Sequence, residues 1–132
     1  MTGMSRILQI KETCIYSVDL GSMREFYSDK LGLEVISSVP GKHIFFRAGS
    51  SVLLCFNPED SRTKESPPAH YAAGKYHFAF EVSAEDYEWK KSEVLSLGIR
   101  ITDTVIWKSG QESFYFEDPA GNVVEIVPVG IW

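Results

Sequence analysis

The sequence predicts an α+β fold built from two copies of one strand–helix–three-strand unit. Each half of the 132-residue chain contains one segment with helical spacing of its apolar residues, with strand-like segments before and after it. The motif Leu31-Gly32-Leu33, at the end of the first expected helix, returns 66 residues later as Leu97-Gly98-Ile99. A repeat of this kind indicates two similar modules that pack together.

The first unit begins with a strand over residues 8–18, because polarity alternates along this segment. Glu12 shares one face with Ile10, Cys14 and Tyr16, and we expect this to be the more apolar face of the strand. A helix is expected over 22–31, and Gly32, directly after it, is expected to supply a left-handed cap. Three further strands are then expected at 34–39, 43–47 and 51–57.

The second unit follows residues 59–74, a charged, proline-containing segment typical of a surface linker. It is expected to contain a strand, a helix and four further strand segments, at 75–82, 83–97, 99–103, 104–108, 113–116 and 123–127. We therefore expect a single domain over 1–132, with module one at about 6–58, the linker at about 59–74 and module two at about 75–132.

The composition of the chain narrows the class of partner. A net charge of -5 and a pI near 5.2 disfavour nucleic acids and anionic membrane surfaces as partners. The sequence has no apolar run of membrane-spanning length and no signal-peptide core at its start, so a cytoplasmic location is expected. The expected partner is a small molecule.

One carboxylate stands in a segment that otherwise has the pattern of a buried strand. Glu125 lies within the letters GNVVEIVP, directly after a strong turn signal. Ionised carboxylates are rarely buried without a partner, because their desolvation is costly, so Glu125 needs a cation. The repeat aligns Glu12 with His77 and Glu125 with Cys55, which places candidate ligands at matching positions of the two units.

These features resemble the vicinal oxygen chelate superfamily, which includes glyoxalase I, fosfomycin-resistance enzymes, extradiol dioxygenases and bleomycin-binding proteins. The resemblance rests on the two modules, on DLGSMREFYSDKLGLEV and on YFEDPAGNVVEIVP, and it covers the chain from Leu8 onward. It implies a glyoxalase-like fold, in which two βαβββ modules form a curved sheet around a cavity, and it implies a homodimer. It also implies one divalent metal ion, held by Glu12, His77 and Glu125.

Two carboxylates and one imidazole suit Zn, Mn, Ni, Fe or Co, and they leave positions open for a substrate oxygen. The resemblance implies an isomerase, lyase or thiol transferase that uses Lewis-acid activation of a small substrate with vicinal oxygens. Glu12 and Glu125 are the candidate catalytic residues, since either can act as a base when it loosens from the metal. Cys55 at the fourth ligand position departs from the glyoxalase I pattern.

Two other functions remain open at this point. A metal-free small-molecule binding or resistance protein is the alternative, in which Glu12 and Glu125 are exposed or pair with lysines such as Lys11 or Lys75. An Fe(II) extradiol dioxygenase fits less well, because those enzymes usually present a histidine where this chain has Glu12.

Several aromatic and charged residues are candidates for substrate binding. Arg47 is expected to meet an anionic group, and His70 to close over the site from the linker loop. The side chains expected to line the cavity are those of Tyr16, Phe46, Trp107 and Tyr115.

Overall fold

The computed structural model describes residues 5–132 of the chain. Its first half contains β1 (Glu12–Tyr16), α1 (Leu20–Arg24), the π-helical continuation η1 (Glu25–Lys30), β2 (Glu34–Val39), β3 (His43–Ala48) and β4 (Ser51–Phe56). A short helix, α2 (Pro58–Ser61), begins the connection to the second half. The second half contains β5 (His77–Val82), α3 (Tyr87–Ser96), β6 (Asp103–Ile106), β7 (Glu112–Glu117) and β8 (Val123–Pro128).

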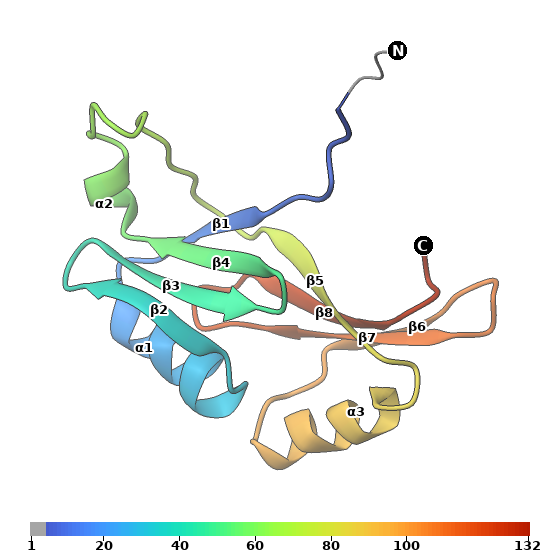
Figure 1. Cartoon of the computed structure of the whole chain (residues 1–132). Helices are drawn as coiled ribbons and strands as arrows, with labels where there is room; N and C mark the ends of the chain where they lie inside the picture. Colours follow the sequence, from blue (N-terminus) through green and yellow to red (C-terminus); the bar gives the residue numbers. More distant parts are fainter. Residues whose placement is uncertain (1–4) are drawn as a thin grey trace.

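The strands form two four-stranded sheets with the same connectivity (Figure 1). The strand order is β1-β4-β3-β2 in the first sheet and β5-β8-β7-β6 in the second. In each sheet the first strand runs parallel to the last, and the other neighbours are antiparallel. The predicted pair of βαβββ modules is therefore confirmed, and β1 and β5 each lie at a sheet edge.

Some boundaries differ from the prediction for local reasons. The first helix starts at Leu20 because Oδ1 of Asp19 accepts a hydrogen bond from the backbone N–H of Ser22 at 3.0 Å and caps it. The expected separate strand at 99–103 is wrong, since Ile99 packs in the core and strand pairing begins only at Asp103. β1 is also shorter than expected, covering residues 12–16 of the predicted 8–18.

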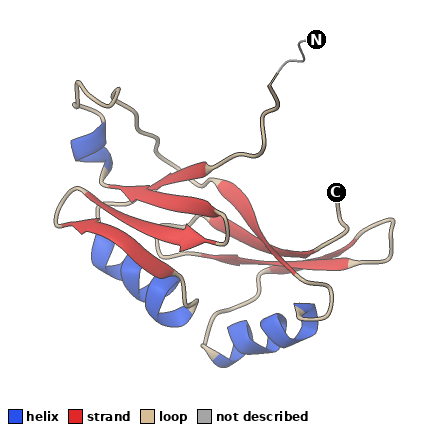
Figure 2. Ribbon diagram, in the orientation of Figure 1, coloured by secondary structure: helices blue, strands red, loops and turns tan. Residues whose placement is uncertain are grey.

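The helices α1 and α3 lie on the same side of the two sheets (Figure 2). Side chains from both helices and both sheets join in one hydrophobic cluster, so the modules share a core. Tyr27, on η1, is fully buried, and its O–H donates to Oδ2 of Asp118 at 2.6 Å. Asp118 lies in the turn between β7 and β8, so this bond ties the helix of the first module to the hairpin of the second.

Strand pairing sorts the side chains of each sheet onto a core face and an opposite face. Ile15 is 1% exposed and belongs to the core cluster, whereas Glu12 and Cys14 are exposed. The face of β1 that carries Glu12, expected to be the more apolar one, therefore lies away from the core, and the opposite face, with Ile15, packs into it. We call the face that carries Glu12 the first outer face, and the face of the second sheet that carries His77 and Glu125 the second outer face.

Among residues 5–132, no helix is both long enough and apolar enough to cross a bilayer.

Candidate metal centre

His77 and Glu125 lie close together on the second outer face. The parallel pairing of β5 with β8 sets Ala79 opposite Glu125, so His77 and Glu125 project from the same face two positions apart. Nε2 of His77 lies 3.2 Å from Oε1 of Glu125. The imidazole side chain is 51% exposed and the carboxylate side chain 7%, so the pair spans the boundary between solvent and the packed sheet.

The hydrogen-bonding pattern of this pair requires a cation. Nδ1 of His77 lies 3.0 Å from the carbonyl oxygen of Val123, which only accepts, so Nδ1 carries a hydrogen. In a neutral imidazole Nε2 then has a lone pair, which faces the lone pairs of Oε1 of Glu125. Only a proton or a metal ion between these atoms makes the contact favourable. A histidine that binds a metal through one ring nitrogen usually donates the N–H of the other ring nitrogen to a carboxylate, a backbone carbonyl or water, as Nδ1 of His77 does here.

The second carboxylate oxygen points to the same need. Oε2 of Glu125 is buried and has no hydrogen-bond partner among the described residues. Buried polar atoms are nearly always paired, and those that are not commonly mark a place where an ion or water binds. The donor set, one imidazole nitrogen and two carboxylate oxygens, suits a divalent cation such as Zn²⁺ or Mn²⁺.

Tyr115 stands beside this pair. It is the register partner of Glu125 across β7 and β8, and its ring centre lies 5.9 Å from that of His77. Burial raises the pKa of Tyr115, and the nearby Glu125 carboxylate acts in the same direction. The phenol is therefore a hydrogen-bond donor beside the Glu125 carboxylate.

Glu12, the third predicted ligand, lies on the other sheet as the exposed first residue of β1. Across the described part of the chain, no three His, Cys, Asp or Glu side chains come together in a group able to hold a metal ion. One chain by itself thus brings together His77 and Glu125 but not Glu12.

The alternative ion pairs with lysines do not form. Lys75 pairs with Glu117 at 3.3 Å, and Lys11 donates to the carbonyl oxygen of Ser50. Within residues 5–132, the ionic partner of Glu125 is His77, and Glu12 has none. Neither carboxylate is accounted for as half of a lysine salt bridge.

Strand register shows which positions of the two modules correspond. β1 pairs with β4 as β5 pairs with β8, so Glu12 at the start of β1 corresponds to His77 at the start of β5. Glu12 is paired with Val52, and Leu54 lies two residues further along β4. His77 is paired with Val123, and Glu125 lies two residues further along β8. Three of the four equivalent positions therefore carry a metal-binding side chain, and the fourth carries a leucine.

The predicted correspondence of Glu125 with Cys55 is wrong by one residue. Cys55 is fully buried and faces the core, where it is paired with Ile15 and Ile44 on the neighbouring strands. Burial raises the pKa of the Cys55 thiol to about 12, and the Asp118 carboxylate adds to the effect. Cys55 is a packing residue rather than a ligand.

Tyr16 and His70 meet on the first outer face. The Tyr16 hydroxyl lies 2.7 Å from Nδ1 of His70, and the centroids of the two rings are 5.7 Å apart. The His70 ring also stands edge-on to Phe56 at 4.5 Å, and the His70 backbone N–H donates to the carbonyl oxygen of Ser61 at 3.1 Å. These contacts hold the connecting segment against the end of β1.

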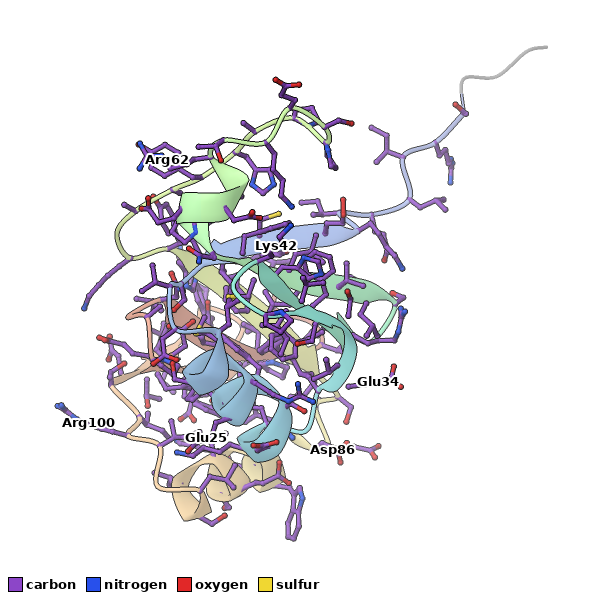
Figure 3. The ribbon with its side chains drawn as sticks, turned by 90° about the vertical axis from the view of Figure 1, so that its left-hand side faces the viewer. Glu25, Glu34, Lys42, Arg62, Asp86 and Arg100 are labelled. Atoms are coloured by element: carbon purple, nitrogen blue, oxygen red, sulfur yellow. The ribbon has the colours of Figure 1, made fainter. Side chains whose placement is uncertain are left out.

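The remaining predicted substrate-binding residues have different surroundings. Arg47 lies on the first outer face, and its Nε is 3.8 Å from Oε1 of Glu34. Glu34 is labelled at the right-hand edge of the molecule in Figure 3. Trp107 follows β6, and its Nε1–H donates to Oγ of Ser113 at 3.0 Å. Phe46 is 0% exposed in the core, so its predicted place in the cavity lining is wrong.

The adjacent Phe45, which was not predicted to line the site, is the phenylalanine of this pair that lies on the first outer face. It is the register partner of Leu54, which is itself opposite Cys14. Alternation along β3 places Phe45 and Phe46 on opposite faces but does not by itself show which face is buried.

Two of the open clefts formed by residues 5–132 flank the sheets. One, of about 370 Å³, lies between the start of α1 and the turn joining β2 to β3. The other, of about 470 Å³, lies between the turn joining β3 to β4 and strand β5. Ala79, the register partner of Glu125, lines the larger cleft together with core-side residues of β5 and β8, but His77 and Glu125 do not line it.

A family model described as Glyoxalase/Bleomycin resistance protein/Dioxygenase superfamily matches residues 9–126. The chain belongs to this superfamily. The match confirms the resemblance on which the expected fold rested, but the superfamily hosts several activities, so membership alone does not assign a reaction. Comparison with curated proteins gave no match.

Several solved structures are similar to this chain over almost its whole length. A lactoylglutathione lyase from Agrobacterium tumefaciens is 34% identical, with a TM-score of 0.90 over 96% of this chain and 98% of that one. A mutant of the fosfomycin resistance protein FosX from Listeria monocytogenes, complexed with Mn(II), is 18% identical, with a TM-score of 0.70 over 96% and 94%. A virulence protein from Salmonella typhimurium is 21% identical, with a TM-score of 0.73 over 94% and 98%. The last two similarities concern the fold alone.

Proposed function

We propose that this chain is a divalent-metal-dependent enzyme that activates a small substrate with vicinal oxygens, as an isomerase, lyase or thiol transferase. The observation that carries the proposal is the His77–Glu125 pair, in which two acceptor atoms face each other and Oε2 of Glu125 is buried without a partner. A purely structural role would leave that oxygen unsatisfied, at a cost of about 1–3 kcal/mol. A bound cation relieves both features.

The third ligand is proposed to come from a second copy of the chain. Glu12 and the His77–Glu125 pair lie on different sheets, and each belongs to an outer face turned away from the shared core. In the proposed homodimer, the first outer face of one copy opposes the second outer face of the other, and Glu12 of the partner subunit completes the site. The two-fold axis of such a dimer repeats the contact and so generates two such sites.

A cation held there supplies Lewis-acid polarisation of a substrate oxygen. The side chains have separate tasks. His77 and Glu125 are fixed by the sheet, so they suit the role of rigid ligands. Leu54, at the fourth equivalent position, donates nothing and leaves an additional coordination position, which suits a substrate that binds through two adjacent oxygens.

The different exposure of the two carboxylates indicates which of them can act as the base in proton transfer. Glu125 is buried and in contact with His77, whereas Glu12 is exposed and free of ionic partners among the described residues. Glu12 is therefore the better candidate for a base that loosens to accept a substrate proton. Tyr115 is placed to donate a hydrogen bond to a substrate oxygen.

The similarity to a lactoylglutathione lyase selects the first reaction to test, the formation of lactoylglutathione from methylglyoxal and glutathione. Protein stripped with chelator would be reloaded separately with Zn²⁺, Mn²⁺, Ni²⁺, Co²⁺ or Fe²⁺. We expect activity only after reloading, and we expect Glu125→Gln and His77→Gln to lower metal affinity by at least about 10–100-fold. Trp89→Leu, at an exposed position on α3, is the matched control.

Other results would favour the other candidates. Absence of near-stoichiometric metal binding would sink the enzyme proposal and favour a metal-free binding protein. Oxygen consumption with catechols in the presence of Fe²⁺ would instead indicate a dioxygenase and overturn the argument from Glu12.

A further inference from the structure

We propose that residues 5–10 of each chain, which we call the arm, bind a second copy of the chain as an added strand along the free edge of β5. The inference rests on the proposed function in one respect, since it takes from it the dimer in which Glu12 of the partner subunit meets His77.

The arm carries apolar side chains that its own chain leaves uncovered. Ile7, Leu8 and Ile10 are 95%, 91% and 83% exposed. The arm belongs to no helix or strand, and it leads away from the body of the molecule ahead of β1 (Figure 1). Several large aliphatic side chains exposed together commonly mark a surface that another molecule covers.

β5 has an edge that no described strand covers. It pairs with β8 alone, and a parallel ladder uses the backbone groups of alternate residues. The carbonyl oxygen of Val82 accepts the backbone N–H of Val129 at 2.9 Å, so the even-numbered residues of β5 face β8. The N–H and C=O groups of Ala79 and Glu81 therefore face the free edge, where residues 5–132 offer them no backbone partner. Such an edge is a template for another strand.

The same alternation identifies the free side of β1. The carbonyl oxygen of Lys11 accepts the backbone N–H of Val52 at 2.8 Å, so the odd-numbered residues of β1 face β4. When the strand geometry is continued into the arm, the backbone groups of Leu8, Ile10 and Glu12 turn to the free side.

One register satisfies both edges. β1 and β5 are the equivalent edge strands of two modules with the same topology, and equivalent edges that meet about a local two-fold axis run antiparallel. When Glu12 lies opposite His77 in such a pair, the free N–H and C=O groups of the arm face those of β5. With one residue of each pair from either copy, the pairs are Glu12–His77, Ile10–Ala79 and Leu8–Glu81.

This register also fills the larger cleft. Ile7 falls opposite Val82, whose side chain packs against the core cluster. Because directly paired residues point to the same face of a sheet, Ile7 enters the cleft that Val82 lines. The other large apolar side chains of the lining are those of Leu31, Leu33, Phe80 and Ile126.

Charge is complementary in the same register. On the face opposite to Ile7, Arg6 lies diagonally across from Glu81, a separation that a long side chain spans. Neither residue has an ionic partner among residues 5–132. The arm therefore brings a cation to a carboxylate that its own chain leaves unpaired.

Disulfide trapping tests the register in a Cys14→Ser background, where the remaining Cys55 is buried. The pair Ile10→Cys with Ala79→Cys would place two Cα atoms about 5.5 Å apart, within disulfide range. The matched control, Ile10→Cys with Glu81→Cys, is diagonal at about 7–8 Å, beyond that range. After mild oxidation in chelator, we expect at least about tenfold more covalent dimer from the first pair on a non-reducing gel. Equal yields, no covalent dimer, or a cross-link within one chain would each overturn the proposal.

Hydrogen exchange followed by NMR tests the same pairing without any substitution. We expect the amides of Leu8 and Ile10 to exchange at least about tenfold more slowly than those of Ile7 and Gln9, and equal rates would overturn the added strand. Zinc titration of the unsubstituted protein separates this proposal from the proposed function. A cross-linked arm without zinc binding would overturn the metal centre alone, whereas zinc binding without the cross-link would overturn the arm alone.

Discussion

Replacing Glu125 with leucine should stabilise the metal-free protein even though it destroys the proposed centre. The substitution removes Oε2, a buried oxygen with no partner among the described residues, which is worth about 1–3 kcal/mol. It also removes the contact with His77, whose side chain is half exposed, so that loss is only about 0–1 kcal/mol. The net expectation is a free energy of unfolding that is higher for Glu125→Leu in the presence of chelator, by about 1.5 kcal/mol within a range of about 0–3 kcal/mol.

Bound zinc should make the wild-type protein more stable than Glu125→Leu. Zinc at one hundred times its dissociation constant stabilises a binding protein by about 2.7 kcal/mol, and the variant should gain none of this. Urea unfolding of both proteins, with chelator and with zinc, measures the four values. The reasoning is refuted if Glu125→Leu is the less stable protein in chelator, or if zinc stabilises both proteins equally.

Three further predictions concern the rest of the fold. Tyr27→Phe removes the hydrogen bond to Asp118 and should lower the free energy of unfolding by about 1.5–3 kcal/mol, and a loss below about 0.5 kcal/mol in urea unfolding would contradict it. The hydrogen bond from Lys91 holds the pKa of Glu112 below its ordinary 4.5, so the stability from this pair is present above pH 4.5 and is lost as the pH falls through the lower native value. Lys91→Met should therefore destabilise at neutral pH but not in strong acid, and a destabilisation independent of pH in urea unfolding would count against this. In a Cys14→Ser variant the remaining thiol, Cys55, should react with a thiol reagent only on unfolding, and rapid labelling of the native protein would show that it is not buried.

Much of the architecture was predictable because local signals and the internal repeat agree. The left-handed glycines at 32 and 98 follow the two helical segments, as the repeat required. The family resemblance, which grouped His77 with Glu125 in one site, named two side chains that lie 3.2 Å apart in the structure.

What failed was the assignment of faces and register. Alternation shows which residues share a face but not which face the helices cover. The more apolar face of β1, with Glu12, therefore proved to lie outside the core, and Phe46 was preferred to Phe45 as a lining residue. Aligning the repeats by sequence similarity made Cys55 the equivalent of Glu125 in the first module. The parallel pairing of β4 with β1 and of β8 with β5 shows that the equivalent residue is Leu54. The relation between Glu12 and the other two ligands depends on a second chain in the proposed dimer, and one sequence does not specify that arrangement.

The most direct test of a metal centre shared between two copies is complementation. Neither Glu12→Gln nor His77→Gln homodimers should bind zinc tightly, because each variant spoils both of its sites. After unfolding and refolding as an equal mixture, half of the dimers should be mixed, and each of these should contain one intact site, giving about one tight site per four chains by calorimetric titration. No recovery of tight binding in a mixture that contains folded mixed dimers would contradict the shared centre.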